Sequence, residues 1–251
     1  MKIIIGLLLF FYAIIGFANP SNHYLNLSYQ FLEELQAGSN TYNTVLAYQN
    51  ITLDSLAEAL DTEDKKKAFW LNTYNGFVQQ ILLKNPELFE NRGEFFTAKR
   101  INIAGILMSF DDIEHGIIRA SRWKLSLGYL RKPFSPKYVR LLRTKKPDGR
   151  VHFALNCGAK SCPPIATFHA ASLNQELDKI TKQYLQSTTK LSDEAITITP
   201  LMSWFRADFG GKKGIKKDFL LAYDIVPSTA GKNLVFDTYD WTLSLGNYTA
   251  L

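Results

Sequence analysis

The sequence predicts an α+β fold: a single mixed domain in which several helices pack on a small, mainly antiparallel sheet. The chain has 251 residues and is 46% hydrophobic, which is enough to bury a sizeable core in one domain. Helical patterns precede and interrupt a few short strand patterns, instead of alternating with strands as in a parallel α/β array. No repeat or linker divides residues 19–251, so we expect one globular domain there.

Residues 1–18 have the pattern of a secretory signal peptide. Lys2 is followed by sixteen uncharged residues, and the segment ends in Gly16-Phe17-Ala18, a small-x-small cleavage pattern. Sixteen residues fall short of the roughly 20 that span a bilayer, and no later apolar run approaches that length. We therefore expect cleavage after Ala18, an exported protein that is periplasmic or secreted, and no stable membrane span.

The first half of the remaining chain carries helical periodicity. In residues 19–60, apolar side chains recur at steps of three and four residues, at Leu25, Tyr29, Leu32 and Leu35. A second helix is predicted over residues 61–84, because Glu63 and Asp64 complement the helix dipole at its start. Asn85-Pro86 would end that helix, since the residue before proline disfavours helical geometry.

The middle of the chain predicts a short helix and two strands. The helix covers residues 110–119, with Ser109 as its cap. Residues 138–143 and 151–155 are predicted to be strands on either side of the turn-forming segment 145–149.

The last third of the chain predicts two helices and a strand. Ser172 and Gln175 are in capping-box spacing at the start of a helix that runs to about residue 186. Residues 195–199 form a short strand with Ile196 and Ile198 on one face, and residues 217–223 form a last helix.

The charge of the chain does not identify a partner. Lys and Arg number 29 against 23 Asp and Glu, a formal net charge of +6, and basic folds without nucleic-acid partners are common. The lysine run at residues 212–217 is interrupted by glycine, which is typical of a solvated loop. No nucleic-acid fold signature, P-loop or dinucleotide fingerprint is present, so we expect no nucleic acid, no cofactor and no metal. The oligomeric state is not indicated.

Both cysteines of the chain lie in one loop, and their pattern leaves four roles open. Cys157 and Cys162 follow an apolar segment and precede Pro163-Pro164. An exported protein meets an oxidising compartment, which favours a disulfide between them. Alternatively, Cys157 is a nucleophile, or both cysteines bind a metal with His152. A redox dithiol is the fourth role, although the spacing is not C-x-x-C.

A nucleophilic Cys157 requires a base and an orienting group. His152 lies an odd number of residues away, so on a continuous strand it would point to the opposite face. We therefore expect His115, on a separate helix, to be the base. Asn72 and Asn75 are three residues apart on one helix face and could orient the imidazole or stabilise an oxyanion. The structural alternative is that these amides hold the fold together through buried hydrogen bonds.

Further residues are candidates for binding a ligand. His115 and Arg119 share a helix face, whereas Glu114 projects roughly 100° away. An ion network on the helix surface is the structural alternative for Glu114 and Arg119, and core packing is the structural alternative for Tyr74. The predicted binding residues are Tyr74, Glu114, Arg119, His152, Lys160, Ser161 and Cys162.

Five sequence blocks together resemble the domain of unknown function 547 family. They read AFWLNTYN at residues 68–75, DDIEHGIIR at 111–119, PDGRVHFALNCGAKSCP at 147–163, WFRADF at 204–209 and YDW at 239–241. The resemblance covers about residues 45–247 and implies no established reaction. It implies that ten residues occupy motif positions of the family: Asn72, Tyr74, Asn75, Glu114, His115, Arg119, His152, Cys157, Cys162 and Asp208.

Two functional hypotheses follow. The first is an exported thiol-dependent hydrolase or acyltransferase that acts on a small molecule or a peptide-like ligand, with Cys157, His115 and Asn72 or Asn75 at its centre. The alternative is a non-catalytic binding module of the cell envelope, stabilised by a Cys157–Cys162 disulfide. A count of free thiols in the unreduced protein separates them.

Overall fold

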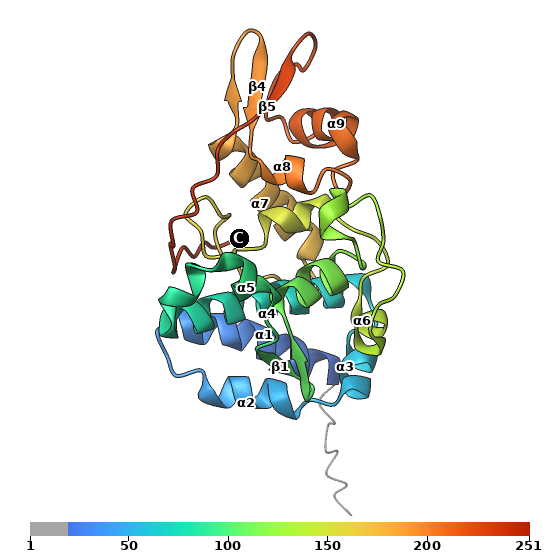
Figure 1. Cartoon of the computed structure of the whole chain (residues 1–251), viewed down its shortest axis with the longest axis vertical. Helices are drawn as coiled ribbons and strands as arrows, with labels where there is room; N and C mark the ends of the chain where they lie inside the picture. Colours follow the sequence, from blue (N-terminus) through green and yellow to red (C-terminus); the bar gives the residue numbers. More distant parts are fainter. Residues whose placement is uncertain (1–19) are drawn as a thin grey trace, which may run out of the picture.

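The computed structural model describes residues 20–251 and confirms the predicted α+β class as a single domain (Figure 1). Helices from the first half of the chain form the lower part of the molecule in Figure 1, and a small sheet with short helical segments forms the upper part. The signal peptide predicted for residues 1–18 lies outside the described residues. Of the helices within residues 20–251, none combines the length and the hydrophobicity that crossing a membrane requires.

The regular elements are mostly helical. The α-helices are α1 (Pro20–Gln36), α2 (Tyr42–Asn50), α3 (Leu53–Ala59), α4 (Glu63–Lys84), α5 (Arg92–Thr97), α6 (Lys137–Leu142), α7 (Leu173–Thr188), α8 (Leu201–Trp204) and α9 (Gly211–Gly214). The π-helical segments are η2 (Asp112–Ile118) and η5 (Ile215–Leu221), and the 3-10 segments are η1 (Pro86–Phe89), η3 (Lys124–Ser126) and η4 (Gly149–Phe153). The strands are β1 (Ile101–Ile103), β2 (Ile106–Met108), β3 (Lys190–Leu191), β4 (Ala195–Ile198) and β5 (Asn233–Phe236).

Helix α4 is the central helix and has the predicted ends. The Thr62 side chain accepts a hydrogen bond from the Lys65 amide at its start, and Asn85 follows its last residue. Its middle is buried on all sides. At Gly76, an added Cβ would lie 2.5 Å from the Phe31 ring of α1, so glycine allows the two helices to approach closely.

The strands form two small sheets. β1 and β2 pair as an antiparallel hairpin, and the second sheet has the order β3-β4-β5 with one antiparallel and one parallel pair. The predicted strand at residues 195–199 is confirmed as β4, whose Ile196 and Ile198 are both buried.

Two hydrophobic clusters meet along α7. Leu173, Leu177 and Ile180 belong to the cluster of the lower part, and Tyr184 and Leu185 belong to the cluster under the three-stranded sheet. One helix therefore contributes to both clusters, which makes the two parts one body. The segment after β5 returns from the sheet to the lower part along the left side of Figure 1, ending beside the middle of the molecule.

The two strands predicted around residues 145–149 are wrong. Residues 138–143 fall mainly in helix α6, which buries Tyr138, Val139 and Leu142 at helical spacing. Residues 151–155 begin in the 3-10 segment η4, where the Asp148 side chain accepts a hydrogen bond from the Arg150 amide. A short apolar pattern of this kind is compatible with either a strand or a helical turn. Here the helical turns form because they bury the apolar side chains against the rest of the protein.

The predicted caps had mixed outcomes. Ser109 and Asp112 form a reciprocal pair in which each side chain accepts a hydrogen bond from the other's backbone N–H. The capping box of Ser172 with Gln175 is wrong, because Ser172 Oγ donates to the Glu176 carboxylate instead. The last helical region also starts earlier than residue 217, with α9 and η5 running from Gly211 to Leu221.

Candidate functional site

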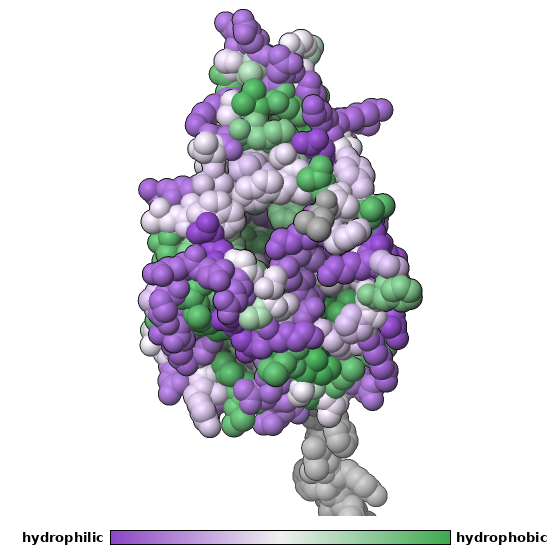
Figure 2. Space-filling view, viewed as in Figure 1, coloured by the Kyte–Doolittle hydropathy of each residue, from purple (hydrophilic) through white to green (hydrophobic). Residues whose placement is uncertain are grey.

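A pocket of about 400 Å³ lies where the lower and upper parts of the molecule meet. Figure 2 shows a hollow in the centre of this face, with hydrophobic surface inside it and hydrophilic residues around it. The pocket is lined by side chains from α4, α5, η2, η3, η4, α8, the segments that follow η3, η4 and α8, and the chain after β5. They are Tyr74, Phe96, Asp111, Glu114, His115, Lys124, Leu127, His152, Leu155, Cys157, Leu201, Trp204, Phe205, Tyr239 and Trp241.

The π-helical segment η2 brings Glu114 and His115 to the pocket together. Its backbone is widened, and the Arg119 amide donates to the Glu114 carbonyl five residues earlier, at 2.8 Å. The sequence predicted that Glu114 would project away from His115, yet both side chains line the pocket. Such widened turns occur frequently at functional sites.

A buried ionic network supports His115 and His152 from behind. Arg119 Nε donates to Asp208 Oδ2 at 2.6 Å, and His152 Nε2 lies 2.9 Å from the same oxygen. Arg119 Nη1 donates to His115 Nδ1 at 2.8 Å. The Phe205 ring stacks on the His152 ring with centres 3.8 Å apart, and the Arg119 guanidinium lies 4.5 Å from the centre of the same Phe205 ring.

This network gives the two imidazoles different hydrogen-bonding roles. Burial and the nearby Arg119 guanidinium lower the pKa of His115 well below its usual value. Burial lowers the pKa of His152 to about 4, although the hydrogen bond to Asp208 opposes this. Both rings are therefore neutral near pH 7. Because His115 Nδ1 accepts from Arg119, its Nε2 carries the proton; because His152 Nε2 donates to Asp208, its Nδ1 is the acceptor.

The Glu114 carboxyl is the group in the pocket that titrates near neutral pH. Burial raises its pKa from 4.5 to about 7, against the opposing effect of Arg119. The Tyr74 hydroxyl donates to Glu114 Oε2 at 3.3 Å, which supports the carboxyl from α4. Asp111 also lines the pocket, and burial raises the pKa of its carboxyl as well.

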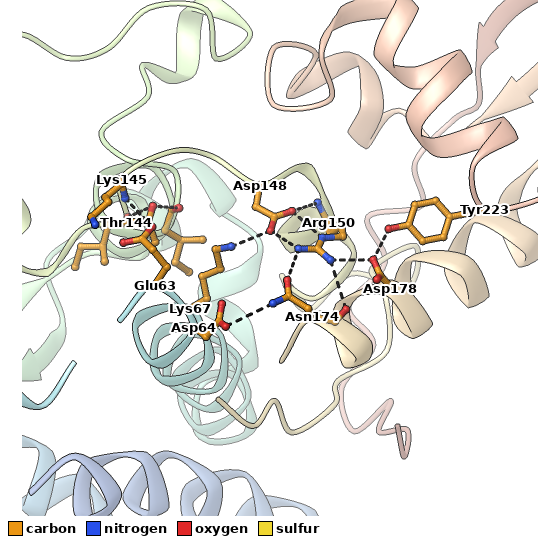
Figure 3. Close-up of polar contacts among 12 residues, drawn as sticks. Glu63, Asp64, Lys67, Thr144, Lys145, Asp148, Arg150, Asn174, Asp178 and Tyr223 are labelled. Atoms are coloured by element: carbon orange, nitrogen blue, oxygen red, sulfur yellow. Dashed lines mark hydrogen bonds and ion pairs between the residues drawn. The ribbon is translucent and has the colours of Figure 1, made fainter. Parts of the chain in front are cut away.

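The segment η4, which carries His152, is anchored on its other side by a polar network (Figure 3). Asp148 accepts from Lys67 of α4 at 2.9 Å and from Arg150 Nη2 at 2.8 Å. Arg150 Nη1 in turn donates to Asp178 of α7 at 2.8 Å. The network ties η4 to two helices and so fixes the backbone that positions His152.

Cys157 and Cys162 form a disulfide in the described structure. Cys157 lines the pocket, and the loop that closes the disulfide also contains Gly158, whose φ of +89° is one that glycine adopts readily. The Tyr239 hydroxyl donates to Cys162 Sγ at 3.2 Å and lies 3.6 Å from Cys157 Sγ. The disulfide and Tyr239 therefore form one wall of the pocket.

Asn72 and Asn75 do not line this pocket. Asn72 makes two hydrogen bonds to the backbone of Phe168, at 2.8 and 2.9 Å. Asn75 donates to the Ala154 carbonyl and accepts from the Asn156 amide, both at 2.8 Å. Both amides are fully buried. Both side chains hydrogen-bond the backbone of distant loops and so hold those loops against α4. This is the structural alternative considered from the sequence, in which the amides stabilise the fold.

The other predicted binding residues are divided between two surfaces. Tyr74, Glu114 and His152 line the pocket, and Arg119 lies buried behind it. Lys160, Ser161 and Cys162 line a separate, more polar depression on the other side of Tyr239. Lys160 is 68% exposed there and pairs with Asp240 at 3.4 Å.

The aromatic walls of the pocket were not predicted as site residues. Trp204 and Trp241 stack with ring centres 5.7 Å apart, and the Tyr239 ring contacts both. These residues lie in sequence blocks already noted for their resemblance to a family, and the density of aromatic residues at 204–205 and 239–241 was the available signal. Lys124 and Leu127 carried no such signal.

Within residues 20–251, no group of three or more His, Cys, Asp and Glu side chains is arranged to hold a metal ion. The predicted alternative in which His152, Cys157 and Cys162 share a metal is therefore not supported, because the two sulfurs bond to each other and His152 bonds to Asp208.

Comparison with known proteins adds one match. A family model described as "Protein of unknown function, DUF547" matches residues 57–185, which is about half of the chain and includes η2, η4 and the disulfide loop. No curated protein and no solved structure matches the chain.

Proposed function

The chain belongs to the DUF547 family, and we propose that its pocket binds a small molecule or a peptide-like ligand without forming a covalent bond to it. The observation that carries this proposal is the state of Cys157. It is the cysteine that lines the pocket, and its sulfur is bonded to Cys162 rather than free to attack a ligand. Pockets of a few hundred Å³ with aromatic walls and a few polar groups are typical of small-molecule sites.

Each part of the pocket has a role in this proposal. The rings of Trp204, Tyr239 and Trp241 provide a nonpolar wall for the body of the ligand. His115 Nε2 donates a hydrogen bond to the ligand and His152 Nδ1 accepts one. The ion pair of Arg119 and Asp208 holds the two imidazole rings in place. Because the pair is buried, it does not contact the ligand.

The first experiment counts free thiols with a thiol-reactive dye in denaturant, before and after reduction. We expect no free thiol before reduction and two per chain afterwards. The second follows binding of two uncharged probes, benzyl alcohol and indole, by NMR. The indole N–H signals of Trp204 and Trp241 should shift at millimolar concentrations of the probe. The signal of Trp70, which α4 buries in the protein core, should not shift. Absence of any selective shift would overturn the proposal.

A second candidate function rests on the position of Cys157 beside two imidazoles. If the disulfide is reduced, Cys157 Sγ could attack an acyl group in the same pocket as His115 and His152. Because Arg119 occupies His115 Nδ1, we expect His152 Nδ1 to accept the thiol proton, in place of the predicted base His115. The test is a burst of one p-nitrophenol per chain from p-nitrophenyl acetate after reduction, lost in Cys157→Ala. The absence of a burst would contradict it.

We also propose that the protein is exported. The uncharged segment after Lys2 has the pattern of a signal peptide. The disulfide is consistent with the oxidising compartment that an exported protein enters. Mass spectrometry of the protein from cell fractions should find an N-terminus at Asn19 in the exported fraction. Recovery of the chain in the cytoplasm with residues 1–18 intact would contradict this.

A further inference from the structure

The charges around the pocket are not balanced. Apart from the neutral imidazoles, its charged lining residues are Asp111, Glu114 and Lys124, which sum to −1 when all are ionised. Lys124 lies at the rim, where its ammonium is 3.3 Å from Asp111 Oδ2. Arg119 is committed to Asp208. Within residues 20–251, the Glu114 carboxylate therefore has no lysine or arginine nitrogen within 4.0 Å.

The walls next to this carboxyl are aromatic. Trp204 and Tyr239 present their rings to the pocket with centres 5.0 Å apart. Two other lining rings already accept cations, since Arg119 lies over Phe205 at 4.5 Å and Arg92 over Trp241 at 5.0 Å. In the described part of the chain, no lysine or arginine lies over the ring of Trp204 or Tyr239. An unbalanced carboxylate beside aromatic rings that carry no cation is an arrangement that attracts an organic cation.

We propose that the ligand of this pocket carries an ammonium group, which pairs with Glu114 while its nonpolar body packs against Trp204 and Tyr239. This inference rests on the proposed binding function and names the class of ligand. The volume of about 400 Å³ limits the ligand to a small amine or to the end of a longer chain.

The environment of Glu114 predicts how binding is linked to protons. The titratable or charged groups that act on the carboxyl come from α4, η2 with its flanking residues, η3 and the chain after β5: Tyr74, Asp111, His115, Arg119, Lys124 and Tyr239. Because burial raises its pKa to about 7, the carboxyl is partly protonated in the empty pocket at pH 7. A cation placed beside it favours the ionised form, so binding at pH 7 should release about half a proton. A neutral ligand of the same shape has no such effect.

The experiment compares benzylamine with benzyl alcohol, which have similar shape and differ in charge. Calorimetry at pH 7, in two buffers of different ionisation enthalpy, gives the affinity and the number of protons released. We expect benzylamine to bind at least about tenfold more tightly than benzyl alcohol, with proton release. Glu114→Gln should remove both the preference and the proton release. Glu114→Asp should keep part of the preference, and the exposed Glu58→Gln should change nothing.

The outcomes separate the two proposals. Equal affinity for both probes, or a preference that survives Glu114→Gln, would overturn the ammonium ligand and leave the binding function intact. Failure of both probes to bind in the wild-type protein would overturn both proposals.

Discussion

Arg119 and Asp208 are 89 residues apart in the sequence and form a buried ion pair between the two parts of the molecule, with each side chain 1% exposed. Arg119 directly follows the π-helical segment η2, and Asp208 lies four residues after the end of α8. Gly128 packs directly on the pair: an added Cβ would lie 2.7 Å from Arg119 Nη2 and 2.8 Å from Asp208 Oδ1. The family match ends at residue 185, so the partner that neutralises Arg119 comes from outside the matched segment.

Substituting Asp208→Asn should strongly destabilise the protein. The amide keeps the size of the side chain but leaves the Arg119 guanidinium buried without a counter-charge, which costs about 3–5 kcal/mol in comparable pairs. Urea denaturation at pH 7 measures this loss. The matched control is Asp224→Asn, since Asp224 pairs with Lys182 on the surface at 3.4 Å; we expect the control to cost less than about 1 kcal/mol. Equal losses in the two variants would show that the buried pair has no special importance.

Reduction of the disulfide should lower stability by a modest amount. Cys157 and Cys162 are separated by only five positions, and closing so short a loop removes little chain entropy, about 2 kcal/mol in the loop-entropy model. The free energy of unfolding should therefore fall by this amount when a phosphine reductant is added.

The control for that measurement is the double variant Cys157→Ser with Cys162→Ser, whose stability should not respond to the reductant. If the wild-type protein is equally insensitive to reductant, the disulfide contributes nothing to the folded state in solution.

Predictions from the sequence succeeded where the cause is local. The predicted cap Ser109 accepts a hydrogen bond from the amide of Asp112, three residues later, so a short stretch of sequence contains the whole interaction. The segments at 138–143 and 151–155 failed because their apolar pattern suits either a strand or a helical turn. The choice depends on contacts such as Lys67 with Asp148, which join residues 81 positions apart.

The sequence predicted only part of the candidate site, because some of its residues are recognisable by type whereas others reach the pocket only through long-range contacts. Glu114, His115 and Cys157 stand out by residue type and were found together at the pocket. The aromatic wall could not be placed, because Tyr239 and Trp241 reach the pocket only when the chain after β5 folds back. That return is fixed by long-range pairing, such as the bridge between Ala159 and Leu243.

Removal of either buried asparagine amide of α4 should destabilise the protein without changing ligand affinity. Asn72→Ala leaves two backbone groups of Phe168 without partners, and Asn75→Ala leaves the Ala154 carbonyl and the Asn156 amide. We expect a loss of about 2 kcal/mol or more for each. Chemical denaturation and benzyl alcohol titration measure the two quantities separately, with the exposed Asn43→Ala as control. A large loss of affinity at unchanged stability would instead assign these amides to the site.

The Glu114 carboxyl should make the protein less stable as pH rises. Burial raises its pKa in the folded state from 4.5 to about 7, so between these values the folded protein binds more protons than the unfolded chain. Stability therefore falls as pH increases from about 4.5 to about 7, and the full penalty is present above pH 7. Glu114→Gln removes the penalty, and at pH 8 the variant should be more stable than the wild type by roughly 2–3 kcal/mol.

The difference between wild type and variant is the quantity to measure, because contributions from titrating groups distant from Glu114 are common to both and cancel. Urea denaturation at pH 4, 6 and 8 should give a difference near zero at pH 4 that grows with pH and then levels off. Glu58→Gln, at an exposed position of α3, should show no such growth. A difference that is constant across this range would mean that the carboxyl titrates in the folded protein as it does in the unfolded chain, and the pocket would then hold an ordinary ionised glutamate at neutral pH.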